Sequence, residues 1–292
     1  MDILCFFANA VFIGDEITYF DGGGWSKNKI TFHAFGYNIE WTQRNGFNKP
    51  FINDRRYEFI GTSSALVKGV EDISHFEASM VKLSYMLSFA LNSQVVFYSY
   101  IENTNNQPSY GKQLSVIGVY SGASPLLSAT HGLLIKRFIE SCWVRFDELY
   151  HTRRLNVVID YFTTADAKQL QVEIKLSLFY TLLECLKSTY AKTNCYPFKE
   201  GWFYYRDSDC KIKDSSLLIK RMLSDAGMEL PCEIMRERNS LIHEGISLAN
   251  GEDVFILYSQ GRDLIGEYIL RILGFSGEYR LHNGRGMETK EI

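Results

Sequence analysis

A short run near the C-terminus combines two side chains that together could cut RNA without a metal ion. The run is Arg238-Asn239-Ser240-Leu241-Ile242-His243-Glu244-Gly245, here named the Arg-His motif. Arg238 keeps its charge at any working pH and can fork onto phosphate oxygens. His243 can carry a proton in either direction near neutrality. The 2′-hydroxyl of RNA would be the nucleophile, and the arginine would stabilise negative charge in the transition state.

An arginine followed by a histidine at this spacing occurs more than once in the chain, so the surrounding residues must distinguish the candidates. Arg236 precedes His243 by a similar interval, and Arg145 precedes His151. Only the run at 238 has a polar residue after the arginine and Glu-Gly after the histidine. Arg145 and His151 fit an exposed helix end better. The plain alternative for the motif is a histidine favoured by the helix dipole, with Arg238 in a surface salt bridge.

Helix geometry limits how the motif could work. Arg238 and His243 differ by about 140° around an ideal helix, so one helix does not easily aim both side chains at one phosphate. Either the helix ends at His243, or two copies pair about a two-fold axis and share one cleft. We expect Arg238 and His243 to be partly exposed. Asn239 would orient the histidine or the phosphate. Three neighbours are accessory candidates, namely Glu244, Glu237 and Arg236.

The pattern Arg-Asn-x-x-x-His followed by Glu-Gly resembles the HEPN superfamily, and within it the ApeA-like branch. The resemblance covers residues 130–278 and includes Leu182-Leu183-Glu184-Cys185-Leu186 and the closing residues 273–279. It implies a small helical bundle that forms a homodimer and acts as a metal-independent endoribonuclease. The implied role is bacterial defence against phage, by abortive infection or toxin-like growth arrest. Catalytically inactive HEPN bundles that bind RNA or serve in assembly remain the alternative.

The family also suggests one form of control that this chain lacks. HEPN toxins paired with nucleotidyltransferase antitoxins tend to carry Tyr two residues after the histidine, as the target of modification. Gly245 stands at that position. The resemblance therefore does not imply control by modification at this position.

The elements that must position the motif divide into two parts and predict an α+β protein. Residues 1–125 alternate apolar and polar side chains between turn residues, which predicts a β-rich, sandwich-like sensor or binding domain with a helix near 76–91. Residues 126–292 predict an all-α HEPN-like bundle, with an aromatic insertion near 192–214 and a frayed polar tail. The bundle helices are expected at 133–149, 153–161, 169–190, 215–226 and 253–273, and the helix of the Arg-His motif is expected to start near Pro231 and to stop at Gly245.

Two further groups of residues could bind RNA. Trp202 and Tyr205 lie in the aromatic insertion and could stack on unpaired bases, or could pack the insertion onto the bundle. Arg153 and Arg154 could add a basic rim, or could simply be exposed charge.

Composition narrows the class of protein. The net charge is −3 and the pI is about 6.1, which argues against bulk electrostatic binding to duplex DNA but leaves room for a local RNA site. Six cysteines without a C-x-x-C pair indicate a reduced, cytoplasmic protein. No stretch is long enough to span a bilayer. Asp160 and Asp166 lack partners at metal-ligand spacing, so no metal or other cofactor is predicted. The expected partners are RNA, a second copy of the chain, and a phage-derived trigger at the N-terminal domain.

Overall fold

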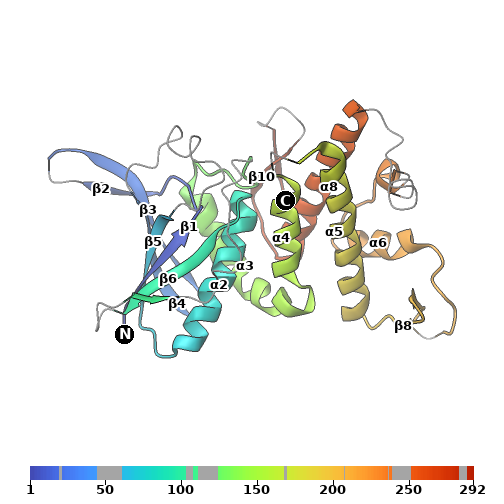
Figure 1. Ribbon diagram of the computed structural model, residues 1–292, viewed down its shortest axis with the longest axis horizontal. Coiled ribbons are helices and arrows are strands. Elements are labelled where there is room, and N and C mark those ends of the chain that lie inside the picture. The colour runs from blue at the N-terminus through green and yellow to red at the C-terminus, as the bar shows by residue number, and fades with distance from the viewer. Residues whose placement is uncertain are drawn as a thin grey trace.

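The N-terminal part of the chain forms an antiparallel sheet in the computed structural model (Figure 1). Seven strands pair in the order β2-β3-β4-β5-β1-β6-β7. They are β1 (Ile3–Ala8), β2 (Glu16–Tyr19), β3 (Trp25–Ala34), β4 (Tyr37–Gln43), β5 (Gly61–Lys68), β6 (Val96–Glu102) and β7 (Pro108–Tyr110). Over the whole chain, the structure describes residues 1–19, 22–44, 61–102, 108–110, 124–167, 170–206, 208–235, 237–238, 251–282 and 288–292.

Alternating side chains give this sheet a buried face and an outer face. Along β1, Ile3, Cys5 and Phe7 are fully buried, whereas Leu4 is 37% exposed. The ring of the fully buried Trp41 in β4 lies 4.4 Å from the ring of Phe7, measured between centroids. The buried face therefore carries large aromatic side chains, in the period-two pattern expected of these strands.

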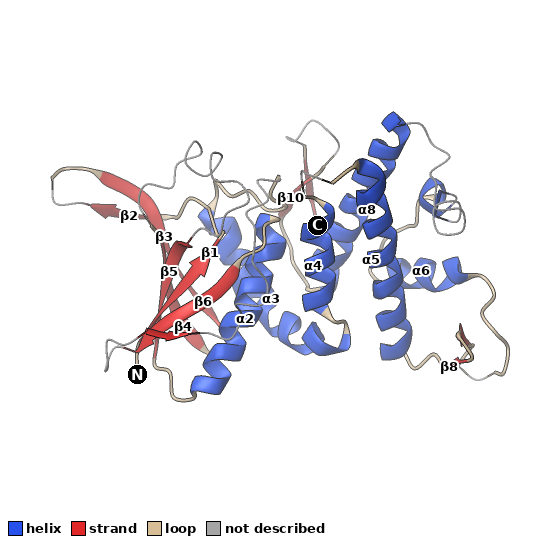
Figure 2. Ribbon diagram, in the orientation of Figure 1, coloured by secondary structure: helices blue, strands red, loops and turns tan. Residues whose placement is uncertain are grey.

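Two helices cover the buried face of the sheet, α2 (Ile73–Leu91) and α3 (Gly132–Thr152) (Figures 1 and 2). α2 begins after Asp72, whose carboxylate accepts hydrogen bonds from two backbone N–H groups of the first turn. α3 meets the sheet where the Trp143 ring lies 5.5 Å from that of Phe35. The expected α+β class is confirmed. The sandwich-like part of that expectation is wrong for the described residues, because helices and not a second sheet cover the buried face.

The C-terminal part is largely helical, as expected. After α3 come α4 (Leu155–Ala165), α5 (Val172–Thr193), α6 (Ser215–Ser224) and α8 (Gly251–Ile272). α5 packs against α4, α6 and α8, so it lies at the centre of this part. α8 approaches α5 closely at Gly261, where a Cβ atom would lie 2.5 Å from the ring of Phe179. A larger residue at Gly261 would force these two helices apart.

The sheet and the helices share one hydrophobic core. The ring of Phe89 in α2 lies 6.2 Å from that of Phe138 in α3 and 5.3 Å from that of Phe162 in α4. Apolar packing therefore joins residues 1–125 to residues 126–292 across the expected domain boundary.

The last described residues fold back onto α8. β10 (Glu278–Arg280) pairs with β11 (Thr289–Glu291). Tyr279 and Lys290 both donate hydrogen bonds to the Glu267 carboxylate, at 2.8 and 2.7 Å. The expectation of a frayed tail is therefore wrong for these residues. Within the described parts of the chain, every helix is too short or too polar to cross a membrane, and all six cysteines are unpaired.

Candidate functional site

The helical residues that lead into the Arg-His motif are held against α5. Residues 232–235 and 237–238 are helical and follow Pro231, which suits the start of a helix. Ile234 is fully buried, and its carbonyl oxygen accepts a 2.9 Å hydrogen bond from the Tyr180 hydroxyl of α5. Burial, with a smaller contribution from Glu237, raises the pKa of the Tyr180 hydroxyl, so this hydroxyl stays protonated and keeps donating.

Arg238 is fixed by a carboxylate of α5. Its Nε and Nη2 atoms lie 3.0 and 2.5 Å from one oxygen of Glu184 in α5. The other oxygen of Glu184 accepts from Lys187, one turn along α5. Glu184 therefore bridges two cations, and the three side chains together carry one net positive charge. The side chains of Arg238 and Lys187 are each 10% exposed, whereas that of Glu184 is 31% exposed.

This geometry corrects one expectation. Arg238 as a whole residue is 8% exposed, so the prediction that it is partly exposed is wrong. The cause is a partner that local spacing cannot reveal, because Glu184 lies 54 residues earlier in the chain. A carboxylate inside an apolar helical stretch, as in Leu182-Leu183-Glu184-Cys185-Leu186, is the signal that could have pointed to it.

The other candidate residues in and beside the motif divide between the described and the undescribed parts of the chain. Glu237 is described and is 8% exposed. The other four fall outside the described residues, so the convergence of the arginine and the histidine stays a prediction. They are Arg236, Asn239, His243 and Glu244.

The aromatic insertion forms a groove beside Glu184. It contains a two-stranded hairpin, β8 (Phe198–Lys199) and β9 (Trp202–Phe203). A groove of about 470 Å³ separates this hairpin from α5 and α6. Trp202, Phe198 and Phe203 line it from the hairpin, and Glu184, Lys187 and Ser188 line it from α5. Glu184 therefore lines the same groove as Trp202 and also bonds Arg238.

Tyr205 lies outside this groove. Its side chain is at the margin of exposure, at 36%, and the Arg221 guanidinium lies 5.9 Å from the centre of its ring. Stacking of Tyr205 on RNA remains a prediction.

The two arginines of the expected basic rim, Arg153 and Arg154, differ in their exposure to solvent. Arg153 is 6% exposed and donates to the Tyr268 hydroxyl at 2.7 Å, to the Thr189 hydroxyl and to the Leu186 carbonyl. This contradicts its expected place on an exposed rim, because the end of α3 turns inward against α5 and α8. Arg154 is exposed, so its expected contact with RNA remains a prediction.

The aspartates considered as metal ligands have protein partners instead. Asp166 is buried and pairs with Arg262 at 3.2 Å, while the Tyr258 hydroxyl donates to it at 2.7 Å. His282 Nε2 lies 3.2 Å from the same carboxylate. Among the described residues, no three of the usual metal-ligating side chains gather in one place.

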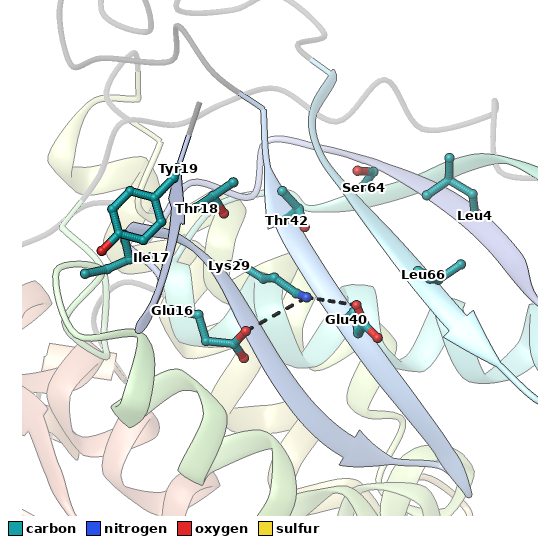
Figure 3. Close-up of a pocket in the computed structure, with 10 residues that line it drawn as sticks. All are labelled: Leu4, Glu16, Ile17, Thr18, Tyr19, Lys29, Glu40, Thr42, Ser64 and Leu66. Carbon is teal, nitrogen blue, oxygen red and sulfur yellow. Dashed lines mark hydrogen bonds and ion pairs between the residues drawn. The ribbon is translucent and has the colours of Figure 1, made fainter. Parts of the chain in front are cut away.

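A second hollow, of about 530 Å³, lies on the outer face of the sheet (Figure 3). Lys29 reaches across it to Glu40 at 2.9 Å and to Glu16 at 3.9 Å, and Lys68 also pairs with Glu40. Hydrogen bonds from Lys68 and Lys29 lower the pKa of the Glu40 carboxyl to about 2. Because these lysine and glutamate side chains pair with one another, the hollow suits the binding of a ligand better than the catalysis of a bond-breaking reaction.

The chain was compared with protein families, with curated proteins and with solved structures, and none of them matches it. The case for a function therefore rests on the Arg-His motif and on the surroundings of Arg238.

Proposed function

We propose that the chain is a metal-independent endoribonuclease of HEPN type that acts as a homodimer. The observation that carries the proposal is the setting of Arg238. This arginine is held through two nitrogens beside a groove that is lined by an exposed tryptophan. A fixed cation next to an aromatic surface fits a ribonucleotide, with the phosphate on the arginine and the base on the ring.

The proposed reaction is internal transfer at phosphorus. The 2′-hydroxyl oxygen attacks the adjacent phosphorus and gives its proton to a base, while the bond from phosphorus to the 5′-oxygen breaks. The 5′-oxygen leaves with a proton, and the products are a 2′,3′-cyclic phosphate and a 5′-hydroxyl. His243 would move these protons, and Arg238 would stabilise the extra negative charge on the phosphate. Asn239 would orient the histidine or the phosphate.

The rival proposal is a HEPN module that binds RNA without cutting it. One observation favours it: the Glu184 carboxylate already occupies two nitrogens of Arg238, where a phosphate would have to bind. In the nuclease proposal RNA displaces this carboxylate.

The cellular role is proposed from the resemblance alone. It would be cytoplasmic anti-phage defence by abortive infection or toxin-like growth arrest. The hollow on the outer face of the sheet is the candidate surface for a phage-derived trigger.

The deciding experiment incubates the purified chain with single-stranded RNA in EDTA and follows the products. A cyclic phosphate end, and loss of cleavage by about 10²- to 10⁴-fold in His243→Ala, are expected. A substrate with 2′-deoxyribose at the cut site should be inert. RNA binding without cleavage would favour the rival proposal, and cleavage that the chelator abolishes would contradict the mechanism.

A further inference from the structure

The aromatic hairpin exposes side chains that would normally be buried. Phe198 is 55% exposed and Trp202 is 46% exposed, although the hairpin packs next to an apolar core. The ring of Phe203 is partly buried and lies 4.8 Å from that of Phe198, so it anchors the hairpin. Exposed aromatic side chains that line one concavity mark a binding surface more often than isolated ones do. Figure 2 shows the hairpin at the end of the molecule opposite the seven-stranded sheet.

The other wall of the groove is polar. Glu184 and Ser188 of α5 offer acceptor and donor groups, and Lys187 adds a cation. At about 470 Å³ the groove falls in the size range of small-ligand sites. One aromatic wall facing one hydrogen-bonding wall is the arrangement in which proteins hold an unpaired nucleobase.

The charges around the groove suit a phosphate backbone. The cluster of Glu184, Lys187 and Arg238 carries one net positive charge. Lys199 belongs to β8, and the Lys211 ammonium lies 6.0 Å from the centre of the Trp202 ring. Their carboxylate partners lie 3.9 and 3.7 Å away with side chains that are 99% and 80% exposed. Pairs this long and this exposed contribute little, so both lysines can turn to a phosphate.

From these features we infer that the groove between the β8–β9 hairpin and α5 binds an unpaired nucleobase of single-stranded RNA, with Trp202 and Phe198 stacking on it. Bases paired inside a duplex do not reach such a groove, so the site selects single strands. The inference deepens the proposed function, because it names the substrate class for the neighbouring Arg238. Binding does not depend on cleavage, so the groove can be tested by itself.

The test measures the binding of a short fluorescent oligonucleotide by anisotropy. A single-stranded DNA probe resists internal cleavage, and the same sequence as RNA is measured on the His243→Ala chain. Trp202→Ala and Phe198→Ala should each weaken binding by about 5- to 100-fold. Trp202→Phe should restore most of it, because the ring is kept. Trp25→Ala is the matched control, since Trp25 is 64% exposed on β3 of the sheet and lies outside the groove.

Each result has a separate meaning. Unchanged binding in folded Trp202→Ala, a loss of binding in Trp25→Ala as large as that in Trp202→Ala, or a duplex that competes as well as a single strand would overturn the inference. The absence of any oligonucleotide binding would overturn it too, and would point to a protein partner for the exposed rings. If Trp202→Ala weakens binding while no cleavage is ever detected, the groove stands and the proposed nuclease activity fails.

Discussion

Glu184 is the residue on which the candidate site depends most. Its carboxylate bonds two nitrogens of Arg238 and also Lys187, and both cations are largely buried. Glu184→Gln keeps the shape but removes the charge, so two cations lose their counter-ion. We expect a loss of about 2 kcal/mol in the free energy of unfolding, less than for a fully buried pair because Glu184 is partly exposed. Urea unfolding at neutral pH measures it.

An exposed ion pair provides the control for Glu184. Arg145 and Glu148 pair at 2.7 Å along α3, with side chains that are 53% and 55% exposed. Glu148→Gln removes the same charge from the same residue type, yet it should change the free energy of unfolding by less than about 0.5 kcal/mol. Equal effects of the two substitutions would show that the bridge to Arg238 contributes no more than a surface pair.

These residues also mark what the sequence can reveal about the site. Arg238 could be proposed from the sequence because its motif is local. Glu184 was missed because its contact with Arg238 joins distant parts of the chain. Arg153 was misplaced because its type and its position at a helix end both suggest exposure, whereas tertiary packing turns it inward onto Tyr268. Tertiary packing decides which residue a side chain pairs with and which way it points, and a short segment of sequence does not reveal that packing.

At the scale of elements, the packing of α4 against α2 partly buries the carboxyl group of Asp160, and burial disfavours its charged form. Burial raises the pKa of Asp160 from 3.8 to about 6, although Tyr85 of α2 donates to it at 3.5 Å. The folded chain therefore holds this proton to higher pH than the unfolded chain does. The stability that the protonated form contributes is present below about pH 4 and is lost as the pH rises through 6.

Asp160→Asn should relieve this cost, because it keeps an acceptor for Tyr85 and carries no charge. We expect a gain on the order of 1–2 kcal/mol at pH 7, less than the full pKa shift implies because solvent partly screens this half-buried carboxyl, and none at pH 3. Unfolding curves across this range measure both values. Asp209→Asn is the control, since its carboxylate is 99% exposed and its loss should alter stability little at either pH. A gain of equal size at pH 3 would contradict the assignment to ionisation.

The elements themselves were more predictable than their assembly. The long helices α3, α5 and α8 were expected from their apolar spacing, and the β-rich character of residues 1–125 from the alternation of its side chains. The sandwich was expected because alternation along a strand predicts that one face of the sheet is buried, but it does not identify the element that covers this face. Here the apolar faces of α2 and α3 cover it, and only the three-dimensional pairing of faces decides between a sheet and helices.

At the scale of the whole molecule, the common core makes the two expected domains depend on each other. Trp143 of α3 packs on Phe35 of the sheet, and Phe89 of α2 packs on Phe138 and Phe162. A fragment of residues 126–292 would expose these apolar surfaces to water. We expect it to aggregate, or to unfold without a cooperative transition, in calorimetry. A sharp transition with full helical content would instead support two independent domains.

The proposed dimer leads to a complementation experiment. If two motifs share one cleft, a dimer of one Arg238→Ala chain and one His243→Ala chain still places one arginine and one histidine at the same phosphate. Each variant alone should be inactive, and mixing them after mild dissociation should restore part of the activity. Because Arg238 is paired with Glu184, Arg238→Ala also unbalances that carboxylate, so each variant must first unfold cooperatively. Light scattering should give twice the chain mass of 33.6 kDa for the parent and for both variants. A strict monomer, or dimers whose mixture stays inactive although subunits exchange, would rule out the shared cleft.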